Sequence, residues 1–386
     1  NGNPLSEIKE VKLEKKDGRY LVFAIGSGTY SFVAPKSFRK GIIKDEFIFD
    51  RASFPESHAA TIAETPEGLI ASWFGGTKEG NKDVCIWVSH LRNDKWSEPQ
   101  KVADGILNDT TRYACYNPVL YQVPGGDLLL FYKIGPNVAG WTGWMIRSSD
   151  NGHTWSKREA LPEGYLGPIK NKPVMVGNQL VCPSSTEKGG WRTHLEMTSN
   201  QGRTWTKTGP LNDGTIFSAI QPSILFYRDG SMQILCRSKN RSLNESWSKD
   251  GGKTWSAMQA SPLPNNNSGT DAVTLQDGRQ LLVYNHVKPA PELKNGKGPR
   301  TPLNVAVTVD GKKWMAALVL EDSPVSQYSY PSVIQGKDGM VHIVYTWRRE
   351  RIKYVKVDPS QLQLMPIENE QWPGSKVGGA QLSQDD

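Results

Sequence analysis

Residues 148–155 read SSDNGHTW, and the same eight-residue pattern returns as TSNQGRTW at 198–205 and as SKDGGKTW at 248–255. Weaker copies end at Trp96 and Trp314, so that five tryptophans are separated by 59, 50, 50 and 59 residues. Asp and Gly favour a tight turn, because a carboxylate accepts backbone N–H bonds and glycine tolerates a positive φ. The Trp that follows is a large apolar anchor. We interpret the pattern as a structural turn between two strands.

A second repeated element precedes each turn. Six segments begin with a residue that is polar or has a polar end and continue as an apolar strand; these residues are His58, Asn117, Lys172, Gln221, Asp271 and Tyr330. Most segments then reach a hairpin signal such as Asp229-Gly230, and a second apolar strand follows. Six units of strand, turn, strand, turn and strand predict an all-β fold, a six-bladed β-propeller.

The limits of the propeller follow from its last unit, which ends at residues 351–357 with no turn motif after it and therefore lacks a strand. We expect residues 46–51 to supply that strand, which closes the ring and hides its edges. The predicted propeller covers residues 46–370. A small N-terminal β appendage is expected at residues 1–45 and a polar tail at residues 371–386.

The composition limits the classes of partner that the chain is expected to bind. The chain of 386 residues is 37% hydrophobic, so that it can build a core, and its longest apolar runs are too short to cross a bilayer. The formal charge is +7, but Lys and Arg are scattered, which favours a solvated basic surface or an acidic small-molecule or glycan partner over nucleic acid.

The sequence has no metal or cofactor signature. Its four cysteines lack CxxC spacing, and we expect buried free thiols rather than a metal site; they are Cys85, Cys115, Cys182 and Cys236. No dinucleotide or phosphate loop is present, so no cofactor is predicted. The chain begins at Asn1 without a methionine, and we expect a secreted or periplasmic protein whose signal peptide has been removed.

In a propeller the inner strands start at one mouth of the central channel, so the six register residues are expected to meet there. Buried polar groups are costly unless they have partners or line a wet pocket. Arg237 ends one apolar strand and Arg300 precedes another. Arginines in such places are suited to bidentate binding of a carboxylate or sulfate. We therefore predict that Asn117, Lys172 and Asp271 contribute, with these arginines, to a substrate-binding mouth.

The repeated turns resemble the Asp boxes of sialidases, and residues 46–357 resemble the sialidase superfamily, most closely the bacterial predicted neuraminidases or BNR-repeat proteins. Typical stretches are WFGGTKEG at 73–80, GPRTPLNV at 298–305 and YSYPSV at 328–333. The resemblance implies a six-bladed propeller with its active site at the channel mouth. There, three arginines hold the sialate carboxylate, a tyrosine nucleophile is paired with a glutamate, and an aspartate is the acid/base.

Several residues match this pattern. Arg237 and Arg300 match the second and third arginines. Tyr330 matches the tyrosine, with Tyr328 as an alternative, and Asp83 falls at the place of the aspartate.

Other residues depart from the pattern. Glu79 competes with Asp83 for the acid/base role. His58 stands at the place of the first arginine and Gln221 at that of the glutamate. Gln221 is a substrate-binding candidate, but it cannot take a proton from Tyr330, so the usual activation of that phenol is missing.

Three functions fit this altered site. The first is a sialidase-like glycoside hydrolase that removes a terminal acidic sugar, with Arg237 and Arg300 as the clamp and Asp83 as acid/base. The second is a uronate-specific lyase in which His58, titrating near neutral pH, is the base and Tyr330 the acid. The third is a non-catalytic propeller that binds acidic glycans.

An enzyme is favoured over a binding module, because a histidine, a tyrosine and a carboxylate share one mouth with two arginines. The resemblance favours hydrolysis. We predict that His58, Tyr330 and Asp83 are catalytic and that the partner is an acidic glycan or oligosaccharide.

Overall fold

The computed structural model describes residues 11–17, 20–25, 39–325 and 327–374. The chain divides into two compact units, residues 1–37 with 374–386, and residues 38–373. In the first unit, β1 (Val11–Asp17) and β2 (Tyr20–Ile25) form an antiparallel two-stranded sheet. The rest of the predicted appendage up to residue 38, and the predicted tail from residue 375, lie outside the described residues.

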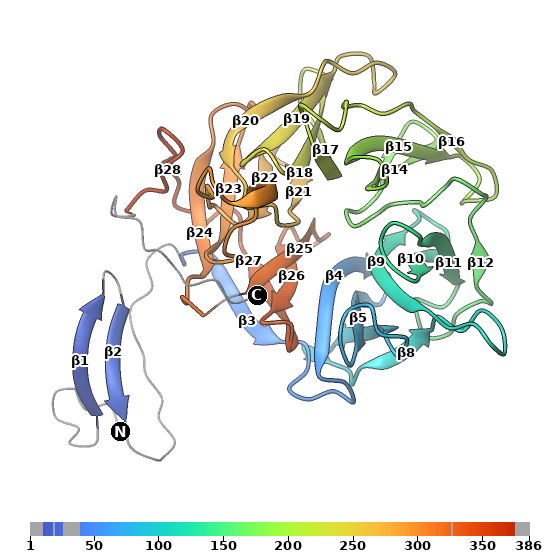
Figure 1. The fold of residues 1–386 in the computed structure, drawn as a ribbon, viewed down its shortest axis with the longest axis horizontal. Coiled ribbons are helices and arrows are strands. Elements are labelled where there is room, and N and C mark those ends of the chain that lie inside the picture. Colours follow the sequence, from blue (N-terminus) through green and yellow to red (C-terminus); the bar gives the residue numbers. More distant parts are fainter. Residues whose placement is uncertain (1–10, 18–19, 26–38, 326, 375–386) are drawn as a thin grey trace. The chain divides into compact units, whose positions relative to one another are not determined.

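The second unit consists of six antiparallel sheets arranged in a ring (Figure 1). The first blade contains β4 (Glu56–Thr65), β5 (Gly68–Gly76), β6 (Cys85–Arg92), β7 (Lys95–Trp96) and β8 (Gln100–Ala103). The second contains β9 (Ala114–Gln122), β10 (Leu128–Gly135), β11 (Thr142–Ser148) and β12 (Glu159–Ala160). The third contains β13 (Val174–Val176), β14 (Gln179–Thr186), β15 (Arg192–Thr198) and β16 (Thr206–Lys207).

The remaining blades follow the same order. The fourth contains β17 (Ala219–Phe226), β18 (Met232–Ser238), β19 (Ser242–Ser248) and β20 (Gln259–Pro264). The fifth contains β21 (Asp271–Thr274), β22 (Gln280–Tyr284), β23 (Leu303–Thr308), β24 (Met315–Glu321) and β28 (Met365–Pro366). The sixth contains β25 (Tyr328–Gln335), β26 (Val341–Trp347), β27 (Arg351–Val357) and β3 (Ile42–Phe47). The predicted six-bladed β-propeller is confirmed.

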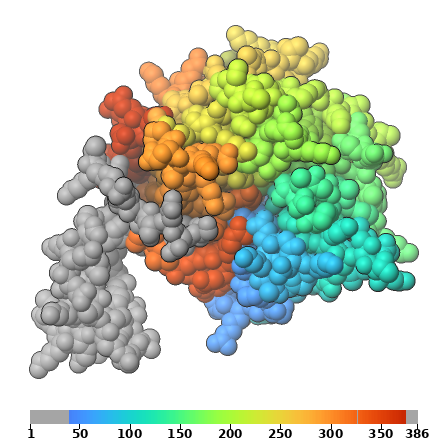
Figure 2. Space-filling model, viewed as in Figure 1, coloured from blue at the N-terminus to red at the C-terminus, as the bar shows by residue number. Residues whose placement is uncertain are grey.

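The core lies between the blades. Buried apolar side chains form six clusters, and each cluster joins two consecutive blades, including the last and the first. Figure 2 shows the same order on the surface, where the colours follow one another round the propeller and the blue first blade lies beside the red-orange sixth. Because each sheet buries both faces against its neighbours, an open ring would expose one apolar face of the first blade and one of the last.

The closing strand is β3, which pairs with β27 and begins earlier than the predicted 46–51. Its register pairs Asp45 with Val355 and Phe47 with Lys353, and Lys353 Nζ lies 2.8 Å from the carboxylate of Asp45, its diagonal neighbour. Ile48 and Phe49, which the sequence placed in the strand, instead enter the core between the sixth and first blades. The predicted boundary at residue 45 therefore falls inside the closing strand.

The C-terminal boundary also moves. β28 extends the fifth blade by pairing with β24, and Trp372, 8% exposed, packs in the core between the fourth and fifth blades. Residue 372 therefore belongs to the propeller, although the predicted polar tail begins at residue 371. Most residues near Trp372 in the sequence are polar, so the pattern did not indicate that this one large apolar side chain would anchor the segment to the core.

The repeated turns have the expected chemistry. The Asp150 carboxylate accepts hydrogen bonds from the backbone N–H of Thr154 at 2.9 Å and from its hydroxyl at 2.6 Å, and the Ser148 hydroxyl donates to it at 2.7 Å. Asp250 repeats this arrangement with Thr254 and Ser248. These hydrogen bonds hold the pKa of the Asp150 carboxyl well below its usual value and lower that of Asp250 to about 2. The motif is a structural turn.

All four cysteines are free and buried, as predicted. Within the described ranges, no helix is long and apolar enough to cross a membrane.

Candidate functional site

Four inner strands carry the same irregularity at the channel mouth. Ala59, Asn117, Gln221 and Tyr330 have positive φ angles of 55°, 37°, 56° and 52°, and the strand ladder skips at each of these places. Such a bulge redirects the side chain at which it occurs. The bulge in the first blade is at Ala59, so His58 is one residue out of the register predicted for it.

Tyr330 is the centre of the site. Its hydroxyl accepts a hydrogen bond from Arg237 Nη1 at 2.6 Å. The guanidinium carbons of Arg237 and Arg300 each lie 5.6 Å from the centroid of its ring, and the His58 ring lies 4.3 Å from it, centroid to centroid. Residues from the first, fourth, fifth and sixth blades thus meet at one aromatic ring.

Both arginines are held in place. Arg237 is 8% exposed, and its Nε donates to the backbone oxygen of Asn267 at 2.9 Å and to its side-chain oxygen at 3.0 Å. Arg237 Nη1 also lies 3.3 Å from Gln221 Oε1, which accepts a second hydrogen bond from it. Arg300 donates from Nη1 to Gln327 Oε1 at 2.9 Å. Fixed guanidinium groups of this kind suit a planar anion.

The alternative tyrosine lies elsewhere. Tyr328 is 1% exposed and belongs to the apolar cluster between the fifth and sixth blades. It packs against Trp347, with ring centroids 6.3 Å apart. Residues two apart share one face of a regular strand, so it is the bulge at Tyr330 that gives Tyr330 to the site and leaves Tyr328 in the core.

His58 is buried beside Tyr330 and is 2% exposed. Its Nδ1 lies 2.9 Å from the Thr346 hydroxyl, which also accepts a hydrogen bond from the backbone N–H of Ala59. Burial, and then the charges of nearby cations led by Arg349, hold the pKa of His58 well below its usual value. The expectation that His58 titrates near neutral pH is therefore wrong, and a buried imidazole whose pKa is so low accepts a proton too weakly to suit the base role in a lyase.

The site contains a third arginine, Arg349, which was not predicted from the sequence. Arg349 lies in the turn between β26 and β27, and its backbone oxygen accepts a hydrogen bond from Ser57, next to His58. Its Nη1 is 2.6 Å from Glu79 Oε2, and its charge acts on both His58 and Arg300. The sequence signal was weak, because this arginine lies in a hairpin turn rather than at a strand start.

The two acidic candidates differ in their surroundings. Asp83 Oδ2 accepts hydrogen bonds from the backbone N–H of Thr77 at 2.8 Å and from its hydroxyl at 2.6 Å, and these bonds lower the pKa of the carboxyl. Asp83 thus stabilises its own loop. Glu79 instead pairs with Arg349, and its charge acts on Arg300. Glu79, rather than the predicted Asp83, belongs to the arginine group.

Lys172 and Asp271 neutralise each other. Lys172 Nζ lies 3.0 Å from Asp271 Oδ2, which also accepts a hydrogen bond from the backbone N–H of Val333 at 2.9 Å. Asp271 Oδ1 accepts a further bond from the Ser223 hydroxyl at 3.1 Å. The carboxylate links the third, fourth, fifth and sixth blades, so its contacts are those of a structural group.

Asn117 is 6% exposed and lies at the bulge of the second blade. Its side chain makes no hydrogen bond to any residue that the structure describes.

Two further titratable groups lie near the arginines. Lys170 is 3% exposed; its Nζ lies 5.9 Å from the centroid of the Tyr330 ring and donates to the backbone oxygens of Thr270 and Pro331. Burial lowers the pKa of Lys170 to about 7. Burial raises the pKa of Glu187, which lies near Arg237 and is hydrogen-bonded to Trp191.

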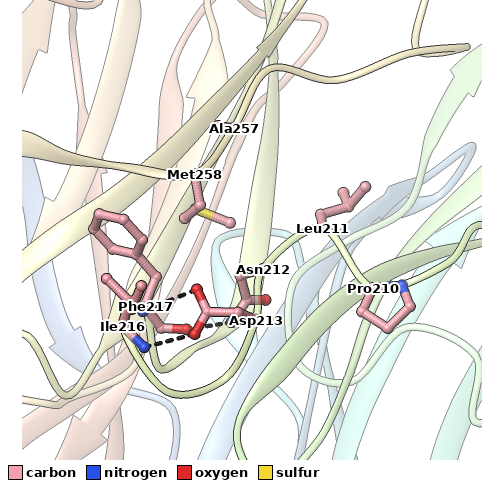
Figure 3. A pocket seen from close by; sticks show the side chains of 8 residues that line it. All are labelled: Pro210, Leu211, Asn212, Asp213, Ile216, Phe217, Ala257 and Met258. Carbon is pink, nitrogen blue, oxygen red and sulfur yellow. Dashed lines mark hydrogen bonds between the residues drawn. The ribbon is translucent and has the colours of Figure 1, made fainter.

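A separate pocket lies between the third and fourth blades (Figure 3). It is lined by Pro210, Leu211, Asn212, Asp213, Ile216, Phe217, Ala257 and Met258. The Asp213 carboxylate is occupied by hydrogen bonds from its own loop, among them those from the backbone N–H groups of Thr215 and Ile216. None of the lining residues is one of the arginines around Tyr330. Among the described residues, no group of three or more His, Cys, Asp or Glu could hold a metal ion.

A family model, the BNR repeat-like domain, matches residues 67–343. The chain belongs to this family. The BNR repeat-like propeller is also similar in fold to solved structures. One is a protein of unknown function from Dyadobacter fermentans, with 15% identity, a TM-score of 0.67, and 84% of this chain and 99% of that chain covered. No curated protein matches.

Two further solved structures are sialidase-fold enzymes. The NanB sialidase from Streptococcus pneumoniae has 13% identity and a TM-score of 0.63, covering 83% of this chain and 71% of its own. The intramolecular trans-sialidase from Ruminococcus gnavus has 13% identity and a TM-score of 0.62, covering 84% of this chain and 99% of its own. The fold and the family confirm the resemblance of the BNR repeat-like propeller to the sialidase superfamily.

Proposed function

We propose that this protein is a sialidase-like glycosidase that cleaves a terminal, carboxylate-bearing sugar from a glycan, with Tyr330 as nucleophile. The observation that carries the proposal is the hydrogen bond from Arg237 Nη1 to the Tyr330 hydroxyl, at 2.6 Å, beside the guanidinium of Arg300. Arg237 thereby contacts the Tyr330 oxygen that would react and also contributes to the adjacent anion site.

Binding would depend on three arginines. Arg237 and Arg300 stand over the Tyr330 ring, and Arg349 supplies the charge that the first arginine of a sialidase would supply. A substrate carboxylate on Arg349 would displace Glu79 from its present ion pair. Charge-assisted hydrogen bonds of this kind are about twice as strong as neutral ones.

In the chemical step, Tyr330 Oη attacks the anomeric carbon while the bond from that carbon to the leaving oxygen breaks. Arg237 stabilises the negative charge that the phenol oxygen carries as its proton is lost to solvent, since Gln221 cannot accept that proton. Glu79, once released from Arg349, takes up a proton from solvent and donates it to the leaving oxygen. Water then hydrolyses the tyrosyl–sugar bond and restores the phenol.

The test compares Tyr330→Phe with Tyr328→Phe, a matched change in the same strand but in the core. With a fluorogenic sialoside and fluorogenic uronides, we expect Tyr330→Phe to lower kcat at least about a hundredfold and Tyr328→Phe to retain activity. Equal turnover by wild type and Tyr330→Phe would contradict the proposal. Unsaturated products from uronate polymers would indicate the lyase instead, and binding without turnover would indicate a glycan-binding propeller.

A further inference from the structure

Lys170 is a buried cation that the proposed mechanism does not use. It precedes the inner strand of the third blade, is 3% exposed, and lies against Tyr330 with its Nζ 5.9 Å from the ring centroid. Its Cε would lie 3.2 Å from a Cβ placed on Gly269, a position that Gln221 Oε1 and Tyr330 Cδ2 also approach, at 3.1 and 3.3 Å. Lysine, glutamine and tyrosine therefore converge on one point of the mouth.

The partners of Lys170 are unusual for a buried ammonium. Its Nζ donates to the backbone oxygens of Thr270 and Pro331, which belong to the fifth and sixth blades. Its hydrogen bonds in the described chain are to carbonyl oxygens, and the nearby carboxylate, Asp271, is already paired with Lys172. A buried charge without a direct counter-ion is costly, so that its protonation depends on the charges around it.

We propose that Lys170 is a fourth cationic member of the anion site and takes up a proton when an acidic sugar binds over Tyr330. The inference rests on the proposed function, because it takes the ligand to be an acidic sugar. Lys170 would be a positioning residue, since it acts on the ligand through its charge and through the backbone at Tyr330 that it holds.

Anion binding and protonation of Lys170 are coupled through charges that the site already contains. The charge of Arg237 disfavours the protonated form of Lys170, whose pKa burial has lowered to about 7. An anion bound by Arg237 offsets that repulsion, and the protonated form of Lys170 becomes more favourable. Binding at a pH just above 7 therefore draws a proton from the buffer.

Other titratable groups face the same ring and must be separated from Lys170. His58 on β4 and Glu187, in the loop after β14, would also gain protons when an anion binds. The pKa of His58 is well below its usual value, so His58 would respond at a lower pH. Burial raises the pKa of Glu187, and the two Lys170 variants, which keep Glu187, separate its proton from that of Lys170. Asp271 is held by Lys172, whereas Glu79 leaves Arg349 when an acidic sugar binds, and the Lys170 variants, which keep Glu79, separate its proton from that of Lys170.

The experiment is calorimetric binding of N-acetylneuraminate, of glucuronate and of sodium sulfate at pH about 7.5, in two buffers with different ionisation enthalpies. We expect wild type to take up about half a proton per ligand. Lys170→Met and Lys170→Arg should take up none at this pH, the first because it has no charge and the second because it is always charged. Lys239→Met, which removes a lysine 4.3 Å from the Trp191 ring, should keep the uptake.

Several results would overturn the inference. They are binding without proton uptake by wild type, equal uptake by wild type and Lys170→Arg, and uptake that grows only below pH 6, which would assign the proton to His58 or Glu187. Lys170→Arg keeps the test valid if Lys170→Met does not fold. If sulfate binds with uptake and neither sugar binds, the substrate class in the proposed function fails and Lys170 keeps its role. If none of the three ligands binds, both fail.

Discussion

The Tyr330 hydroxyl accepts its hydrogen bond from a guanidinium, and the neighbouring Gln221 offers that guanidinium an amide oxygen. A carboxylate at position 221 would form an ion pair with Arg237 and compete with an acidic ligand. The amide adds no counter-charge to Arg237, which favours anion binding. Glutamine in place of glutamate also removes the base that would take the phenol proton. The cations around the phenol oxygen must therefore stabilise its negative charge.

At Arg349, replacement by alanine is expected to raise KM for an acidic sugar by about tenfold, because one charge-assisted hydrogen bond is lost. The fold should be unaffected, since the side chain lies at the surface of the mouth and pairs with Glu79 alone among charged partners given by the structure. Initial-rate kinetics measure the change.

Arg351→Ala is the matched control. Arg351 lies two residues further along, and its guanidinium stacks 3.6 Å from the Phe47 ring on the outer strands of the sixth blade. Its removal should leave KM unchanged. An unchanged KM in Arg349→Ala as well would remove Arg349 from the clamp.

At the scale of the element, the Asp-box turns and the inner strands were predictable because each depends on local chemistry. A turn needs Asp, Gly and Trp within eight residues, and a strand needs an apolar run. The order of the blades followed from these two signals. The bulge did not, because its position depends on how each strand meets its neighbour. This is why His58 was assigned to a register that Ala59 occupies.

The site was predictable only in part for the same reason. Arg237, Arg300 and Tyr330 lie at strand ends, where the repeat defines equivalent positions. Arg349 lies in a hairpin turn and Lys170 in the segment before a short strand. Neither position recurs in the repeat, so only the packed ring shows that they meet. The choice between Glu79 and Asp83 likewise required the contacts of the loop that contains both.

One loop is packed too tightly for any side chain at its glycine. A Cβ on Gly105, which lies between β8 and β9, would be 1.8 Å from the backbone oxygen of Tyr113. Gly105→Ala should lower the free energy of unfolding by about 1–3 kcal/mol, because the loop must move to relieve the overlap. Denaturant unfolding measures this.

Gly209→Ala is the control, because a Cβ at Gly209 would meet nothing within 4 Å. Its unfolding free energy should remain close to that of the wild type. Equal losses in the two variants would show that the contact at Tyr113 is not the cause.

For the molecule as a whole, acid should loosen the three Asp-box turns that contain Asp150, Asp250 and Asp310 over the same pH range. The pKa of Asp250 is lowered to about 2, and those of Asp150 and Asp310 are lowered as well. A carboxyl whose pKa is lower in the folded than in the unfolded chain stabilises the fold above its unfolded pKa of about 3.9. That contribution is lost as the pH falls from about 4 to about 2.

Melting curves should therefore show a falling melting temperature over this range. Asp150→Asn with Asp250→Asn should flatten the fall, because asparagine does not titrate and the natural repeat already uses Asn200 at this position. A fall of the same size in the double variant would assign the acid sensitivity to other groups.

Closure of the ring predicts how the chain tolerates shortening. A chain that begins at Phe38 keeps the whole compact unit of residues 38–373 and should melt cooperatively. A chain that begins after Phe47 loses β3, which leaves β27 as an open edge and Lys353 without Asp45. It should lose cooperative melting. Identical melting of the two chains, followed by circular dichroism, would show that β3 does not close the ring.

β3 is also among the first parts of the propeller to leave the ribosome, yet its partner β27 emerges roughly 300 residues later. At a synthesis rate of about 5–20 residues per second, the strand waits for tens of seconds while five blades form behind it. During this time the backbone N–H and C=O groups of β3 are unpaired and can pair with another strand, including one from another nascent copy of the chain. Nearly every step of assembly can proceed locally, but the last one joins the two ends of the propeller's own chain.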